Sequence, residues 1–361
     1  MPVKTNTNKT YIYYSPATDV TGKKLAEALS ADHGSTLPTG KYDTVICWGA
    51  KTSKPVTINA TTVVNHPDAI RNNRNKFSAL TLMQKAGVNV APFAPVSDVS
   101  KIGKADSSVN LPLIARTSFH QGGKGFWDCP TMTHVKNAVN DGADYLQNLI
   151  EIVDEFRVHV FAGTVLYAVR KVKRSHEETA EAFVSQELAK QKGLAEKAGK
   201  SFDETTARDL LTRQAKMFAQ NGANMLVRSN RLGWKFSRVK ALKKEIADEA
   251  IKAVKAVGLD FGAVDCCIDA TGKVLVLEIN SGPGLEETTF DVFVDALKKI
   301  SSPTQSPQSS VKAVAASHEA VKATNSKTDL LKKLSLASEM VSVADDDEAV
   351  VLNNVFKKMF G

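Results

Sequence analysis

The segment from Gly262 to Gly284 constrains the fold of this chain more than any other part of its sequence. It reads GAVDCCIDATGKVLVLEINSGPG, with two runs of β-forming residues separated by Thr271-Gly272. Glycine adopts positive φ without steric cost, so these runs are predicted to form a β-hairpin with a two-residue loop. In that register Asp265 lies directly opposite Glu278 on the neighbouring strand.

The two faces of the predicted hairpin differ in character because side chains alternate along a strand. One face carries Asp265, Glu278 and Asn280. The other face is apolar throughout: Val264, Cys266, Ile268, Leu275, Leu277 and Ile279. Opposed carboxylates repel, so the polar face requires a cation, and oxygen ligands of this kind suit Mg²⁺ with its preference for substrate phosphates. A solvated polar face is the alternative, and the apolar opposite face argues against it.

Upstream of the hairpin, strands and helices alternate. The strands Thr10–Tyr14 and Thr44–Trp48 flank an amphipathic helix over Thr21–Ala31, which predicts a small parallel α/β unit. A helix over Asn75–Ala86 ends at Gly87, a residue typical of helix C-termini.

The middle of the chain continues this alternation. We expect a strand in Leu111–Arg116, a helix over Met132–Asp141, and two strands joined at Ala162-Gly163. The segment Glu177–Gln220 is rich in Ala, Glu, Lys and Gln and is predicted to be helical. It either shapes a substrate site or is a surface insertion. A further helix over Lys244–Val257 precedes the hairpin.

Taken together, these residues resemble the ATP-grasp ligases. A hairpin with Asp, followed by Glu-x-Asn and a Gly-Pro-Gly-type turn, is the metal motif of that family. Lys76 is similar to the family's first phosphate-binding lysine, and Arg116 lies where the family usually has a second lysine that touches the nucleotide. The loop His120–Gly125 resembles the family's mobile loop over the phosphates, with Gly122, Gly123, Lys124 and Gly125 as the candidate phosphate contacts.

Three further elements of the resemblance follow in the family's order. Glu151, Ile152 and Val153 resemble the hinge strand that holds adenine. Arg157 resembles the basic residue soon after that hinge. Arg228-Ser-Asn230 resembles the Arg-x-Asn of ligases that modify amino acids and peptides, near the ribosomal-protein glutamate ligases and D-alanine–D-alanine ligase. Arg157, Arg228 and Asn230 are therefore the candidate catalytic residues, and Asp265, Glu278 and Asn280 the candidate metal ligands.

The resemblance implies an α/β (α+β) protein with the ATP-grasp fold. The expected divisions are a parallel α/β domain over residues 1–74, an ATP-grasp region over 75–300 with a helical insertion at about 177–220, a linker over 301–325 and a helical tail over 326–361. The expected cofactors are ATP and two Mg²⁺ ions, with Mn²⁺ as a substitute. The implied activity is formation of an amide bond between a carboxylate and an amine through an acyl phosphate, with release of ADP. A nucleotide-binding module without catalysis, recruited to a macromolecular assembly, is the alternative.

Composition narrows the partners. The formal charge of +8 suits an anionic ligand. Lys and Arg are dispersed without interleaved aromatic residues, so nucleic acid is not favoured, and we expect a small molecule or peptide as substrate. No run approaches the ~18 apolar residues of a membrane span. The four scattered cysteines and the polar N-terminus predict a cytoplasmic protein with reduced thiols. A homo-oligomer is left open.

Overall fold

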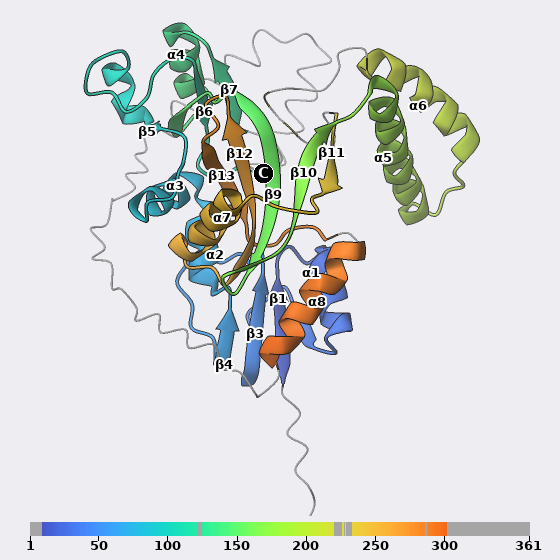
Figure 1. Ribbon diagram of the computed structural model, residues 1–361. Coiled ribbons are helices and arrows are strands. Elements are labelled where there is room, and N and C mark those ends of the chain that lie inside the picture. The colour runs from blue at the N-terminus through green and yellow to red at the C-terminus, as the bar shows by residue number, and fades with distance from the viewer. Residues whose placement is uncertain are drawn as a thin grey trace, which may run out of the picture. The chain divides into compact units, whose positions relative to one another are not determined.

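The computed structural model describes residues 9–120, 125–219, 226, 228, 233–285 and 287–301. The chain divides into two units, 1–306 and 307–361, and every described residue belongs to the first. The predicted linker beyond residue 301 and the predicted helical tail lie outside the described residues. Within the described part, the strands form three sheets (Figure 1).

The N-terminal sheet is parallel, with the strand order β2-β1-β3-β4. Its strands are β1 (Thr10–Tyr14), β2 (Asp32–Gly34), β3 (Tyr42–Trp48) and β4 (Ala60–Val64). Helices α1 (Val20–Ala28) and α8 (Glu287–Ser301) contribute Leu25, Phe293 and Leu297 to a core with Ile12 and Trp48. The predicted parallel α/β unit is therefore confirmed, and α8 closes it from a distant part of the chain.

The second sheet is antiparallel, with the order β5-β8-β6-β7. Its strands are β5 (Phe93–Pro95), β6 (Leu113–Arg116), β7 (Phe126–Cys129) and β8 (Tyr145–Asn148). The accompanying helices are α2 (Pro67–Arg74), α3 (Lys76–Lys85), the 3-10 helix η1 (Val96–Lys101) and α4 (Met132–Asn140). Leu113, Val135 and Leu146 form the centre of the core between α4 and the sheet.

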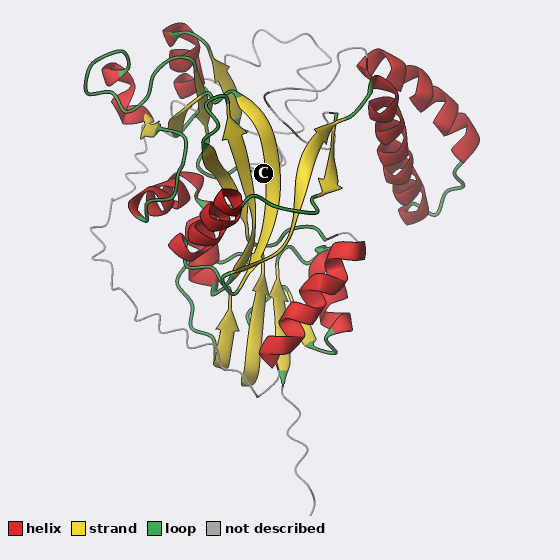
Figure 2. Ribbon diagram, viewed as in Figure 1, coloured by secondary structure: helices red, strands yellow, loops and turns green. Residues whose placement is uncertain are grey.

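The third sheet is antiparallel and holds the hairpin, with the order β11-β10-β9-β12-β13 (Figure 2). Its strands are β9 (Ile152–Phe161), β10 (Thr164–Lys173), β11 (Trp234–Arg238), β12 (Phe261–Asp269) and β13 (Val274–Asn280). Helix α7 (Lys244–Ala256) packs on it through Ile246 and Ala250, which share one core with Val158 and Val264.

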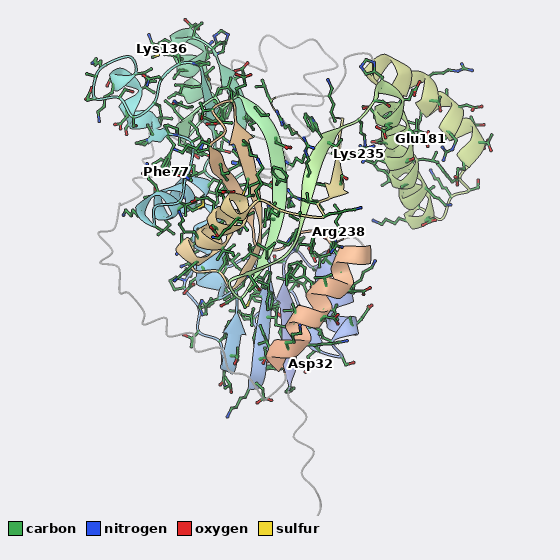
Figure 3. The ribbon with its side chains drawn as sticks, in the orientation of Figure 1. Asp32, Phe77, Lys136, Glu181, Lys235 and Arg238 are labelled. Atoms are coloured by element: carbon green, nitrogen blue, oxygen red, sulfur yellow. The ribbon has the colours of Figure 1, made fainter. Side chains whose placement is uncertain are left out.

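The long charged segment is helical, as predicted, and forms a hairpin of two helices. Helix α5 (His176–Lys197) begins with a capping box between Ser175 and Glu178, and α6 (Glu204–Ala219) packs against it. Their small core contains Val184, Leu188, Leu211 and Ala215 and is separate from the cores under the sheets. Lys235 of β11, labelled in Figure 3, pairs with Glu178 at the base of α5. The hairpin is therefore an insertion between β10 and β11.

The register of the β12–β13 hairpin corrects one prediction. Asp265 pairs with Glu278 as expected, but Cys266 pairs with Val276, so β13 contains a β-bulge. The two-residue loop is wrong, because Asp269 N donates to Lys273 O (3.0 Å) around a longer connection in which Gly272 has φ +85°.

This bulge also changes which residues face the core. Val276 takes the core position beside Val264 and Cys266. Leu275 pairs with Cys267, on the face of Asp265, so the prediction of an unbroken apolar face through Leu275 and Leu277 is wrong.

No helix among the described residues is both long and apolar enough to span a membrane.

Candidate active site

Lys76 and Glu278 meet at the junction of α3 and β13. Asn75 caps α3 by accepting a hydrogen bond from Ser78 N (2.9 Å), which places Lys76 in the first turn. Lys76 Nζ lies 3.8 Å from Glu278 Oε2 and donates to Ile279 O (3.3 Å). Burial raises the pKa of Glu278, but the charge of Lys76 and of neighbouring cations lowers it overall. Glu278 is therefore a half-buried carboxylate held in its ionised form.

Arg116 and His120 also lie close enough to Glu278 to affect its charge. Arg116 NH2 lies 3.1 Å from His120 Nδ1. A guanidinium can only donate, so Nδ1 accepts and Nε2 carries the imidazole proton. Burial first, and then the charge of Arg116, lower the pKa of His120 to about 4. His120 is consequently neutral near pH 7 and presents an N–H group rather than a cation.

Asp265 is engaged by Arg157 of the adjacent strand β9. Arg157 Nε and NH2 donate to the two carboxylate oxygens at 2.7 and 2.9 Å. Burial raises the pKa of Asp265, but Arg157 and then Lys171 outweigh it and lower the pKa to about 2. Arg157 and Asp265 thus form a bidentate pair, a geometry in which arginine is stronger than lysine.

The network extends to two residues that the sequence did not predict. Lys171 of β10 pairs with Glu155 of β9, and its Nζ lies 3.9 Å from Asp265 Oδ2. Arg228 Nε lies 3.8 Å from Glu155 Oε2, and its guanidinium stacks over Trp234 at 4.6 Å. The alternation of Glu155 and Arg157 on one strand was a usable signal. The sequence did not show that Lys171 is the partner of Glu155, because the register between β9 and β10 shifts between Val165 and Tyr167.

Positive charge exceeds negative charge in this network. Five cationic side chains from the described residues surround three carboxylates: Lys76, Arg116, Arg157, Lys171 and Arg228 around Glu155, Asp265 and Glu278. Arg116 Nε is buried and bonds to no described residue. A buried surplus of this kind requires an anion, and a polyphosphate fits it.

The oxygen atoms of Glu278, Asn280 and Asp265 are suitable ligands for Mg²⁺ if phosphate and water supply the remaining ligands. Asn280 Nδ2 lies 3.5 Å from Glu278 Oε1, so the two side chains are adjacent. Asp265 stands opposite Glu278, but both of its oxygens accept from Arg157, which leaves only their second lone pairs. No group of three or more His, Cys, Asp or Glu side chains that could hold a metal occurs within the described ranges. The protein alone therefore provides only part of a coordination shell, which is usual for Mg²⁺ that is bound together with substrate phosphates.

The remaining predicted residues fall into two groups. In the hinge, Glu151 O accepts from Ala270 N (3.1 Å) and Ile152 O from Arg228 NH2 (2.8 Å), while Val153 is exposed. The adenine-binding role of this segment stays a prediction. Gly122, Gly123, Lys124 and Asn230 lie outside the described residues. Gly125 has φ +61°, and a Cβ there would lie 2.2 Å from Thr117 Oγ1, so only glycine fits.

The turn after Asn280 joins the site to the N-terminal sheet. Gly49, directly after β3, donates its N–H to Ser281 O (3.1 Å). A Cβ at Gly282 would lie 2.8 Å from Gly49 Cα. The glycines of the predicted Gly-Pro-Gly-type turn thus permit a close backbone approach that fixes Asn280 relative to the N-terminal sheet.

Comparison with known proteins finds a matching family model and solved structures of similar fold. Residues 216–302 match the model of the RimK-like ATP-grasp domain. The ATP-grasp ligase PsnB, solved with a phosphomimetic variant of minimal precursor, Mg and ADP, has a TM-score of 0.51 at 13% identity, over 82% of this chain and 100% of that one. PsnB with a precursor peptide and AMPPNP gives 0.50 at 14% identity, over 84% and 100%. D-alanine–D-alanine ligase from Bacillus anthracis gives 0.48 at 10% identity, over 81% and 92%.

No curated protein matches the sequence. The chain has the ATP-grasp fold, and the resemblance to ATP-grasp ligases drawn from the sequence is confirmed.

Proposed function

We propose that this chain is an ADP-forming ligase that joins a carboxylate to an amine. The observation that carries the proposal is the partly buried surplus of cationic side chains around Glu155, Asp265 and Glu278 on an ATP-grasp fold. Of the two PsnB complexes described above, one contains Mg and ADP and the other contains AMPPNP, which supports ATP and Mg²⁺ as cofactors.

Lys76 and Arg116 are assigned to the phosphates of ATP. They approach Glu278 from two elements, so a phosphate chain beside Glu278 is flanked by charge from both sides. Mg²⁺ held by Glu278 and Asn280 would neutralise charge on the phosphate oxygens. Arg157 keeps Asp265 ionised and oriented at the same place.

The chemistry needs no protein nucleophile. A carboxylate oxygen of the substrate attacks the γ-phosphorus, the bond to ADP breaks, and an acyl phosphate forms. The amine nitrogen then attacks the acyl carbon, phosphate leaves, and the nitrogen loses a proton. Arg228, beside Glu155, is assigned with Asn230 to the developing charge on the acyl phosphate.

Glu278→Gln tests the proposal. It removes the charge that pairs with Lys76 while preserving the shape of the side chain, so we expect turnover to fall at least 100-fold. Glu278 is partly exposed, so the thermal midpoint should change by only a few degrees. ADP release is measured with mixtures of carboxylates and amines, and hydroxylamine traps the acyl phosphate as a hydroxamate.

Asp269→Asn is the matched control, because Asp269 caps the far end of the same hairpin. It should retain turnover. ADP release by the Glu278→Gln variant at the rate of the unsubstituted chain would remove Glu278 from the site. No ADP release by the unsubstituted chain with any mixture would overturn the ligase itself.

A further inference from the structure

A cavity of about 470 Å³ adjoins the candidate active site on the side of the N-terminal sheet. Its volume lies within the ~300–1,000 Å³ typical of small-molecule sites. The cavity is lined by Ser15 after β1, Lys51 after β3, Arg74 at the end of α2, and the turn Ser281-Gly282. Four segments far apart in the sequence therefore form its wall.

The cavity reaches the proposed reacting centre. Lys76, His120 and Asn280 line it. Lys76 lies 3.8 Å from Glu278, and His120 contacts Arg116. A molecule in the cavity can thus lie beside both the proposed reacting centre and the end of α2.

Two further cations in the cavity wall form no ion pair with a described residue. Arg74 is half-buried and makes no ion pair with a described residue. Arg71, one turn earlier on the same helix, is paired with Asp68 at 2.7 Å. Lys51 likewise has no carboxylate partner within the described part of the chain, although Lys51 O accepts from Tyr13. A half-buried guanidinium without a partner is typical of an anion site.

The single carboxylate in the cavity wall is already in use. Asp19 caps α1, where its Oδ1 accepts from Gly22 N at 2.6 Å. An amine is a cation near neutral pH and would meet one lining carboxylate against three lining cations, Lys51, Arg74 and Lys76, of which only Lys76 is already paired with a described residue, Glu278. The charges therefore favour a molecule that carries more than one anionic group.

We propose that Arg74 and Lys51 bind a second anionic group of the carboxylate substrate, while its reacting carboxylate lies at Lys76. The substrate class is a small dianion, either a dicarboxylate or a carboxylate that carries a phosphoryl group. This assignment rests on the proposed function, because it takes the end at Lys76 as the reacting centre.

Binding to the full chain tests the assignment without turnover. Isothermal titration compares propionate, with one carboxylate, against succinate, glutarate and 3-phosphonopropionate, with two anionic groups. We expect at least one dianion to bind ten times more tightly than propionate. Arg74→Met should remove that difference, and Arg71→Met, the matched control on the same helix, should retain it. The preferred dianion distinguishes a second carboxylate from a phosphoryl group.

Equal binding of all four probes, or an unchanged preference in Arg74→Met, would overturn the assignment. The proposed function can fail independently of this assignment. A preference for dianions without ADP release would support the anion site in the cavity and contradict the ligase activity. ADP release without a preference for dianions would support the ligase and remove the assignment of Arg74 and Lys51.

Discussion

At the scale of single residues, the site depends on carboxylates that folding has already paired. Asp265 was predicted as a metal ligand, and the structure adds a bidentate bond from Arg157 to it. Removing one partner of a buried ion pair lowers the free energy of unfolding by about 3–5 kcal/mol. Asp265 therefore has a structural role in addition to its proposed metal contact, which is why Glu278 is the cleaner test of catalysis.

His159 gives a pH prediction at the same scale. It is buried on β9, stacked on Tyr167 at 4.2 Å, and its Nδ1 bonds to no described residue. Burial first, and then Arg157, lower the pKa of His159 to about 3. The unfolded chain takes up a proton below about pH 6.5 that the folded chain does not bind, so folding stability is present above that pH and falls below it.

At about 1.4 kcal/mol per pH unit, roughly 2 kcal/mol of unfolding free energy should be lost between about pH 6.5 and 5 through this one residue. His159→Phe should flatten the dependence, measured by urea unfolding across this range. His134→Gln, at an exposed histidine of α4, should leave it unchanged. Equal slopes in all three proteins would show that His159 does not set the acid sensitivity.

At the scale of elements, the β12–β13 hairpin is held in place by a close contact between two backbones. The turn at Gly282 rests against Gly49, and the bulge in β13 restores the register that sets Glu278 opposite Asp265. The positions of Glu278 and Asn280 consequently depend on Gly49, on Gly282 and on the bulge in β13.

Gly282→Ala tests that contact. Its Cβ would lie 2.8 Å from the Cα and N of Gly49, so the turn must move away from β3. We expect a loss of about 1–3 kcal/mol of unfolding free energy, as for overpacked sites, together with reduced ADP release. Gly284→Ala meets nothing within 4 Å and should behave as the unsubstituted chain. Equal thermal midpoints and turnover for the two variants would contradict the argument.

At the scale of the whole molecule, α8 connects the end of the described chain to the first sheet. Phe293 and Leu297 are fully buried against Trp48 and Phe261. The first unit of the chain is therefore complete only with this helix, whereas residues 307–361 form the second unit.

Two truncations separate these contributions. A chain that ends at Ser306 should fold and bind an ATP analogue within tenfold of the full-length affinity, a difference below about 1.4 kcal/mol. A chain that ends at Leu285 lacks Phe293 and Leu297 and should unfold at a much lower temperature or fail to fold. A tenfold loss of affinity in the chain that ends at Ser306 would show that the second unit contributes to nucleotide binding.

The sequence by itself determined the local elements and their chemistry. Alternating apolar and polar residues predicted the hairpin, glycines marked the ends of the helices at Gly87 and Gly258, and the order of basic residues suggested a nucleotide site. These signals are local, because strand alternation, helix capping and turn formation depend on neighbours in the chain. The pairing of Asp265 with Glu278 was predicted from a two-residue loop, and it holds because the bulge in β13 compensates for the longer loop.

Only the tertiary structure decided the features that join distant segments. The pairs of Asp265 with Arg157 and of Glu155 with Lys171 need the three neighbouring strands β10, β9 and β12, with a register shift between β9 and β10. The unpaired Arg74 in a cavity wall, and α8 on the first sheet, need packing between parts of the chain that are more than 200 residues apart. No periodicity in the sequence encodes such contacts, because they arise from the burial of apolar faces whose partners are chosen only when the sheets assemble.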